Sequence, residues 1–174
     1  MDKESAAQLV LSEFTHACYV HYTCFVFATL GIPMVTNQFG EQEEIGKVFI
    51  GPSPPEEGNA HSVISVGDLR AFSRKDGRFT DIIAKSTIVS LFAEWDEHYR
   101  PKFAATLGIK PNEVENDLMG DVRKIRNLIV HKKIAKNTRL SCLSWDIDGD
   151  FCVTTEMMGI LMDHLHKMKT WTPF

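Results

Sequence analysis

The sequence predicts an all-α fold, an up-and-down bundle of four to five helices with a small β-hairpin before the last helix. Three observations lead to this prediction. Apolar residues recur every three or four positions in long segments, as in a helix with one buried face. Glycine and proline lie between these segments and separate them. Near the end of the chain, Asp148-Gly149 stands between short apolar stretches at 142–145 and 151–154, which is typical of a hairpin turn.

The bounds of the helices follow from residues that start or stop a helix. Four long helices are predicted at 3–30, 80–107, 117–136 and 156–169, and a short fifth helix at 65–74. Gly31-Ile32-Pro33 is expected to end the first helix. Thr80 is expected to cap the helix at 80–107, and Pro101 to bend or restart it because proline lacks a backbone donor. Thr154 or Thr155 is expected to cap the last helix.

Length and composition fit one domain covering residues 1–174. A hydrophobic content of 44% and a charged content of 24% are ordinary for a soluble globular protein. A segment at about 37–60 is rich in glycine and proline, so it is predicted to be an inserted loop over the bundle. Within it, Val48-Phe49-Ile50 forms either a short strand or an apolar tether.

The start of the chain and its cysteines favour a cytoplasmic protein. Met1-Asp2-Lys3-Glu4 is too acidic for a signal peptide, and the four cysteines form no C-x-x-C pair. The apolar run at 17–35 is interrupted by polar residues, which favours a buried helix, with a membrane span as the alternative. The sequence has no Gly-rich phosphate loop, no Ser-His-Asp pattern and no convincing metal-ligand cluster, so neither a cofactor nor a metal is expected.

The helix predicted at 117–136 carries three residues suited to phosphate-ester chemistry: Arg126, Asn127 and His131. At 3.6 residues per turn, Asn127 and His131 lie one above the other, and the long side chain of Arg126 reaches the same patch. Guanidinium binds phosphate through two parallel hydrogen bonds and stays charged, whereas imidazole takes or gives a proton near neutral pH. Asn112 and Glu115 have capping-box spacing before this helix, and Asn137 is expected to end it.

Positive charge is concentrated around these three residues. The segment 121–139 contains seven Lys or Arg residues against one acidic residue, Asp121, so it carries +6 while the remaining chain carries −10. This asymmetry fits a local anion-binding patch on an acidic body. A solvent-exposed helix face is an equally good interpretation. The patch residues expected to bind substrate phosphates are Arg123, Lys132, Lys133 and Lys136.

The arrangement Arg126-Asn127-x-x-x-His131 resembles the R-x4-H motif of HEPN domains. The resemblance implies an all-helical, often dimeric protein, and the active members of that superfamily are metal-independent ribonucleases, many of them toxins or antiviral effectors. It also implies an acidic residue from a neighbouring helix near the motif, for which Asp96 is the first choice and Glu94 and Glu97 are the alternatives. An antitoxin or a nucleotidyltransferase is the kind of protein partner that the resemblance implies.

We therefore expect an endoribonuclease that acts on RNA as a homodimer, without a membrane partner. His131 would act as acid or base for attack of the ribose 2′-hydroxyl, Arg126 would stabilise the phosphate, and Asn127 would orient His131 or donate to the same oxygens. The alternative is a non-catalytic HEPN-like module that binds nucleotides or partner proteins. Whether Arg126 and His131 share an open site or pack into the core distinguishes the two.

Overall fold

The computed structural model describes residues 2–39, 45–132, 138–147 and 150–168. Its α-helices are α1 (Lys3–Thr36), α2 (Val66–Phe72), α3 (Arg78–Ala93), α4 (Arg100–Leu107), α5 (Asp117–His131) and α6 (Thr155–His166). Its strands are β1 (Lys47–Ile50) and β2 (Ser62–Ser65), and short 3₁₀ turns lie at Asn37–Phe39, Pro55–Glu57 and Pro111–Glu113.

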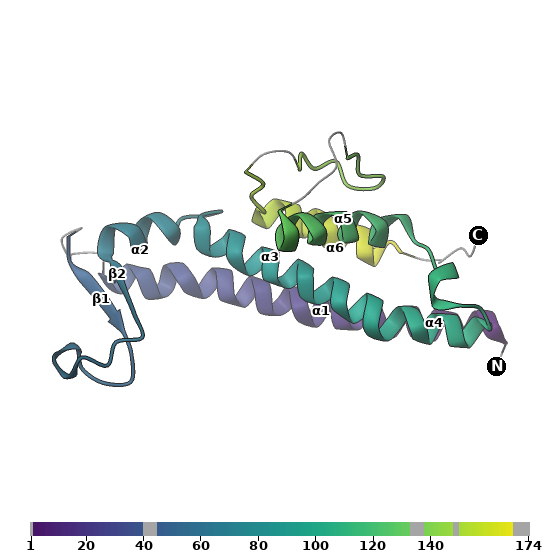
Figure 1. The fold of residues 1–174 in the computed structure, drawn as a ribbon, viewed down its shortest axis with the longest axis horizontal. Coiled ribbons are helices and arrows are strands. Elements are labelled where there is room, and N and C mark those ends of the chain that lie inside the picture. Colours follow the sequence, from purple (N-terminus) through teal and green to yellow (C-terminus); the bar gives the residue numbers. More distant parts are fainter. Residues whose placement is uncertain (1, 40–44, 133–137, 148–149, 169–174) are drawn as a thin grey trace.

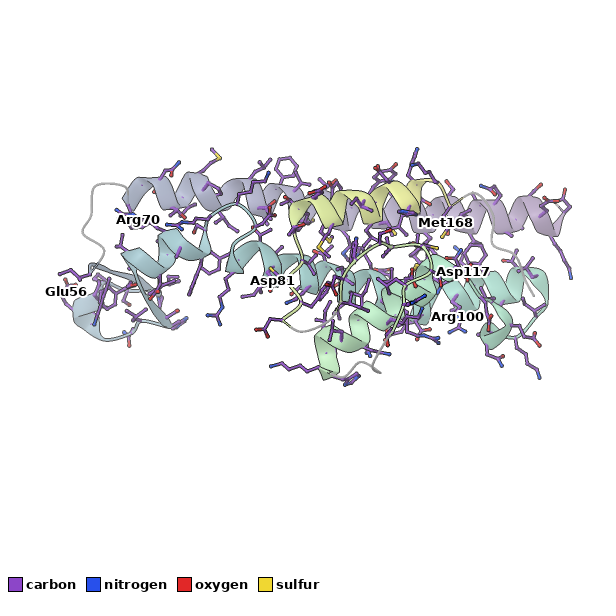
Figure 2. All side chains as sticks on the ribbon, turned by 90° about the horizontal axis from the view of Figure 1, so that it is seen from above. Glu56, Arg70, Asp81, Arg100, Asp117 and Met168 are labelled. Atoms are coloured by element: carbon purple, nitrogen blue, oxygen red, sulfur yellow. The ribbon has the colours of Figure 1, made fainter. Side chains whose placement is uncertain are left out.

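Two long helices form the base of the molecule. One of them is built from three consecutive segments: α3, the π-helical turn Glu94–Tyr99 and α4, which follow one another without a break. Counted as one helix, they reduce the six α-helices of the described residues to five. This long helix runs antiparallel to α1, and the Lys3 ammonium donates a hydrogen bond of 2.8 Å to the Leu107 carbonyl at their shared end. α5 packs on α3 and α6 packs on α1, forming a second layer over the middle of the pair (Figures 1 and 2). The predicted mostly helical fold is confirmed.

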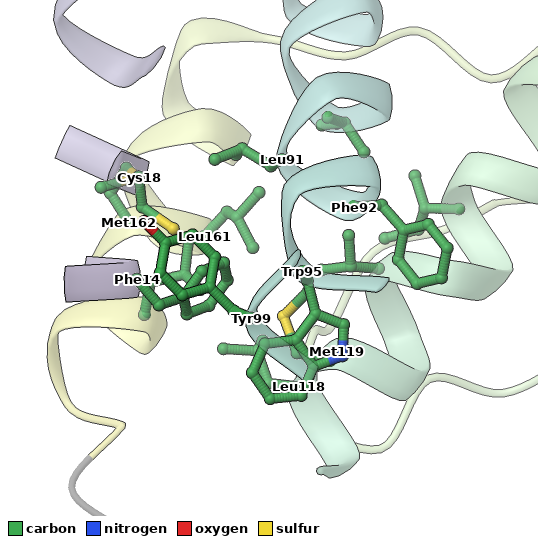
Figure 3. Close-up of a cluster of buried hydrophobic side chains, with 14 of the residues drawn as sticks. Phe14, Cys18, Leu91, Phe92, Trp95, Tyr99, Leu118, Met119, Leu161 and Met162 are labelled. Atoms are coloured by element: carbon green, nitrogen blue, oxygen red, sulfur yellow. The ribbon is translucent and has the colours of Figure 1, made fainter. Parts of the chain in front are cut away.

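The core lies where the two layers meet (Figure 3). Phe14 of α1 contacts two rings of the long helix, with centroids 5.0 Å from Trp95 and 5.2 Å from Tyr99. Tilted aromatic pairs at these distances contribute beyond the area they bury. Leu118 on α5 and Leu161 on α6 close the cluster, since both are buried against it. The core therefore fixes the inward face of α5 and leaves its other face open.

The long helix passes Pro101 by widening. The Arg100 amide donates to the Trp95 carbonyl, five residues back, and Pro101 lies in the first turn of α4. A proline in a regular helix clashes with the carbonyl four residues before it. A π-turn directly before the proline relieves that clash, so the helix continues through Pro101 with a change of hydrogen-bonding pattern.

α1 continues past Pro33 to Thr36, beyond the predicted end at residue 30. The Thr36 hydroxyl contacts the Ile32 carbonyl at 2.8 Å and the Ser73 hydroxyl at 2.8 Å, which ties the last turn to the chain beyond α2. A contact with a residue 37 positions away thus extends the helix. By length and composition alone α1 could span a membrane, a test that the core helix of a soluble protein also passes.

The prediction of a hairpin before the last helix is wrong. Residues 142–145 and 151–154 form no strand; the two-stranded antiparallel sheet pairs β1 with β2, with Val48 opposite Ile64. Side chains take the backbone donors that a hairpin would need: the Leu143 amide donates to Asp121 and the Val153 amide to Asp81. The turn residues Asp148 and Gly149 themselves lie outside the described residues.

The segment predicted as an inserted loop is partly ordered by that sheet. Val48-Phe49-Ile50 belongs to β1, which settles the choice between strand and tether. The predicted short helix is present as α2, with Ser65 accepting a hydrogen bond from the Asp68 amide at 2.9 Å. Figure 1 shows α2 and the two strands close together at the C-terminal end of α1.

Three predicted helix ends shift. Gly77 rather than Thr80 precedes the first residue of α3. Asn116 caps α5 by accepting from the Met119 amide at 3.1 Å, so Asn112 and Glu115 do not form the expected capping box. α5 ends at His131, five residues before the predicted end. Asn137, the predicted C-cap, lies outside the described residues.

Candidate active site

α5 presents two chemically different faces because of its sequence periodicity. Leu118, Val122 and Ile125 are buried against the core, which fixes the helix on α3. On the opposite side, Arg123 is exposed and Asn127 is half-buried. The residues predicted to be functional therefore lie on the face that the core leaves open.

The structure brings Arg126, Asn127 and His131 together. Arg126 Nη1 donates to Asn127 Oδ1 at 3.1 Å and lies 3.3 Å from His131 Nε2. Its guanidinium carbon also lies 6.0 Å from the centre of the Phe92 ring, a cation–π contact that supports it from α3. Arg126 is half-buried and His131 is exposed. Asn127 thus orients Arg126, whereas the sequence predicts that it orients His131 or binds the substrate.

The contact between Arg126 and His131 defines the hydrogen-bonding state of the imidazole. A guanidinium can only donate, so Nε2 of His131 is the acceptor in a hydrogen bond between the two, with the ring proton assigned to Nδ1. In that arrangement the basic nitrogen of the imidazole faces the guanidinium. Any ligand that draws Arg126 away frees that nitrogen to take a proton.

The end of α5 directly after His131 is a strained turn. Lys132 has φ of 50° in the left-handed region, which favours glycine, and its amide donates to the Leu128 carbonyl at 2.9 Å. Lys132 is exposed beside His131. The turn places one cation at the open end of the motif.

Asp96 is engaged elsewhere in the described chain. Its carboxylate accepts from Arg100 Nη1 at 3.0 Å, the i,i+4 surface pair that competes with a catalytic role. Of the two alternatives, Glu94 lies 3.8 Å from His21, and Glu97 lines a separate hollow with His98. Among the interactions of the described residues, none joins these three carboxylates to Arg126 or His131.

Asp96 nevertheless borders a cleft beside α5, of about 230 Å³. The cleft lies between the π-turn and the start of α5, where Figure 2 shows Arg100 and Asp117 close together. Arg123 lines it from α5 and Phe92 from α3, and Phe92 is also the ring under Arg126. The cleft and the Arg126–His131 pair are therefore neighbours that share one aromatic residue.

The predicted basic patch divides into different groups. Arg123 and Lys132 are exposed and available to a ligand. Lys124 instead contacts Asp121 at 3.2 Å and donates to the Arg139 carbonyl at 2.9 Å. Lys133 and Lys136 lie outside the described residues.

Asp121 is a key residue that the sequence reasoning missed. It is fully buried and accepts from the backbone amides of Ser141 at 2.8 Å, Cys142 at 2.6 Å and Leu143 at 3.1 Å. It thereby ties the chain after α5 back to the helix. Burial and then the charge of Asp121 raise the pKa of the Cys142 thiol. Helical spacing could have predicted its burial, because Asp121 lies three residues after Leu118, within the apolar stripe.

Comparisons with models of protein families, with curated proteins and with solved structures found no match to this chain. Within the described residues, no three His, Cys, Asp or Glu side chains are grouped so as to hold a metal ion. The fold and the site define a mostly helical protein in which an Arg-Asn-x-x-x-His sequence lies open at the end of a basic helix.

Proposed function

We propose that this chain is a metal-independent endoribonuclease of the HEPN type. The observation that carries the proposal is the 3.3 Å contact between Arg126 Nη1 and His131 Nε2 on the open face of α5. If the pair served helix packing instead, His131 would be buried, whereas it is exposed. An imidazole and a guanidinium side by side supply both proton transfer and charge stabilisation, which is what cleavage of RNA through its own 2′-hydroxyl requires.

In the proposed reaction a substrate phosphate attracts the Arg126 guanidinium and releases His131 Nε2. His131 then takes the proton of the ribose 2′-hydroxyl, whose oxygen attacks the adjacent phosphorus. The new bond between the 2′-oxygen and phosphorus closes a 2′,3′-cyclic phosphate, while the bond between phosphorus and the 5′-oxygen breaks. The leaving 5′-oxygen takes a proton from an acid on the opposite side.

A second copy of the chain supplies that acid in the proposal. One imidazole cannot stand on both sides of the phosphorus, whereas a two-fold dimer brings together two copies of Arg126 and His131. Val130, next to His131, is 47% exposed and offers apolar surface for such an interface. Leu128, the apolar residue two positions earlier, is already packed partly against the core.

Flanking phosphates would meet the exposed cations Arg123 and Lys132. The sequence adds Lys133 and Lys136 to this group as a prediction. Contacts of this kind set affinity without reading sequence, so the proposal covers single-stranded RNA as a class. Production of such an enzyme would harm its own cell, which fits the toxin or antiviral role implied by the resemblance and its need for an inhibitory partner.

One observation favours a second candidate, a non-catalytic nucleotide- or partner-binding module. Asp96 is paired with Arg100, so among the described contacts His131 is the one acid–base side chain placed at Arg126. If no dimer forms, the site lacks a general acid. It would then keep only its capacity to bind phosphate.

The test is an RNA cleavage assay in EDTA with three variants. His131→Ala should lower the rate about 10²-fold or more, the usual contribution of a general acid or base. Arg126→Lys should also lower it, because lysine keeps the charge but loses the planar pair of donors. His16→Ala replaces an exposed histidine on α1 and should leave the rate unchanged. Full activity in His131→Ala would remove the mechanism, and RNA binding without any cleavage would favour the module.

A further inference from the structure

A second, chemically different hollow lies at the opposite end of α3 from the π-turn. It has a volume of about 400 Å³ and lies between α1, the turn that joins α2 to α3, and the first residues of α3 and α6. The side chains from α1 make its wall mostly apolar: Tyr22, Phe25, Val26, Thr29, Leu30 and Pro33. Thr29 adds little polarity to this wall, because its hydroxyl donates to the Phe25 carbonyl at 2.9 Å.

One end of the hollow is polar and positive. Arg74 and Lys75 line it, both are exposed, and neither forms an ion pair with a carboxylate among the described residues. The nearest acid in sequence, Asp76, is occupied, because its carboxylate accepts from the Thr155 amide at 2.7 Å and from the Thr155 hydroxyl at 2.9 Å. Two unpaired cations therefore face a mostly apolar hollow.

The start of α3 adds backbone donors at the same end. Gly77 precedes the helix and provides no side-chain cap, so the first amides of α3 lack the partner that a Ser or Asp would give. The helix dipole places partial positive charge there, which favours an anion.

Thr80 adds a hydroxyl group to the lining of the hollow. This residue is only 6% exposed, lines the hollow, and donates no hydrogen bond within the part of the chain that the structure describes. Among the described residues, the one fully enclosed side-chain polar atom without a partner is Trp145 Nε1. The Thr80 hydroxyl is not such an enclosed atom, and Thr80 lines the hollow. A ligand acceptor placed beside Thr80 would give this hydroxyl a hydrogen-bond partner.

We infer that this hollow binds an amphipathic anion, specifically an alkyl carboxylate of medium chain length. The carboxylate would accept from Thr80, Arg74 and Lys75, and the alkyl chain would lie along the apolar wall of α1. A volume of about 400 Å³ falls in the usual range for small-ligand sites. The inference does not rest on the proposed ribonuclease activity, since it uses no residue of the Arg126–His131 site.

The direct test is calorimetric titration of the full chain with sodium decanoate and with decan-1-ol. The two share an alkyl chain and differ in charge, so decanoate should bind at least about tenfold more tightly, as charged hydrogen bonds contribute that much. Equal affinity for both would mean that the hollow binds only the alkyl chain, and it would overturn the inference. Absence of decanoate binding at millimolar concentration would overturn it as well.

Matched variants then locate the site. Thr80→Val should weaken decanoate binding about fivefold to tenfold, Thr80→Ser should restore it, and Thr87→Val, the same change further along α3, should have no effect. The double variant Arg74→Glu and Lys75→Glu should abolish binding, whereas Lys110→Glu with Lys167→Glu makes an equal charge change elsewhere and should not. Leu30→Glu should weaken binding, and Leu9→Glu on the same helix should not. Unchanged decanoate affinity in the folded Thr80→Val and Arg74/Lys75 variants would place the ligand elsewhere.

Discussion

The Asp121 carboxylate accepts a hydrogen bond of 2.6 Å from the Cys142 amide in the interior of the protein. This contact joins α5 to the segment that leads to α6, across 21 positions of sequence. Two more amides and the ammonium of Lys124 complete the hydrogen bonding of the carboxylate. A buried charge satisfied in this way holds its surroundings in one arrangement, and removing it leaves several donors without a partner.

Asp121→Asn should therefore lower the free energy of unfolding by about 2–4 kcal/mol, because the amide cannot accept on both sides. Chemical denaturation with urea measures the change. Asp117→Asn, at an exposed position in the first turn of the same helix, is the matched control and should cost less than about 1 kcal/mol. Equal small losses in both variants would mean that the Asp121 contacts do not stabilise the fold.

Lys132→Gly should raise the free energy of unfolding by about 0.5–1 kcal/mol. The reason is the φ of 50° at Lys132, which costs free energy for any residue with a Cβ and almost none for glycine. Lys110→Gly is the matched control: its φ of −83° gains nothing from glycine, so stability should fall. A stability loss at both positions would show that the turn after His131 is not strained.

Arg123 should contribute to the salt dependence of RNA binding. Removing one phosphate contact on a single strand flattens the slope of log K against log salt by about 0.7. Fluorescence anisotropy with 2′-O-methyl RNA, which keeps the phosphates but has no free 2′-hydroxyl, measures binding alone. Arg123→Ala and Lys132→Ala should each show the flatter slope, and Lys167→Ala, an exposed lysine at the end of α6, should not. Identical slopes in all three variants would make the patch an ordinary solvated face.

Val130→Glu should convert the protein from a dimer to a monomer and reduce cleavage in parallel. The expectation follows from the exposure of Val130 beside the motif, where a new carboxylate would be buried without a partner in a two-fold interface. Sedimentation at micromolar concentration reports the assembly state. Ile82→Glu, an equally exposed apolar position on α3, is the control and should remain dimeric. A wild-type monomer that cleaves at full rate would remove the shared site from the proposal.

Local sequence signals predicted the helices well because a helix is determined mainly by residues that lie within a few positions of one another. The continuous helix that ends before Gly108, the helix α2 after Ser65 and the Thr154 cap of α6 depend on residues a few positions apart. The stacking of Asn127 below His131 also follows from helical spacing, and the long side chain of Arg126 reaches the same patch.

The errors arose where distant residues decide the backbone. The predicted late hairpin fails because Asp121 and Asp81 take backbone donors from segments 21 and 72 positions away. Asp121 lies in a mostly basic segment, but its helical position is within the apolar stripe of α5, where it is buried. The pairing of Asp96 with Arg100 is a local i,i+4 contact, which the search for an acidic residue near the motif did not take into account.

The chemistry of the cleavage products tests the central claim most directly. A single-stranded RNA should be incubated with the wild type and with His131→Ala in EDTA, and the fragments should be analysed by mass spectrometry. If His131 and Arg126 promote attack by the 2′-hydroxyl, the wild type yields 2′,3′-cyclic phosphate and 5′-hydroxyl ends, a 2′-O-methyl group at the cleaved position blocks the reaction, and His131→Ala yields almost no product. Fragments with 3′-hydroxyl and 5′-phosphate ends, or the same products at the same rate from His131→Ala, would contradict it.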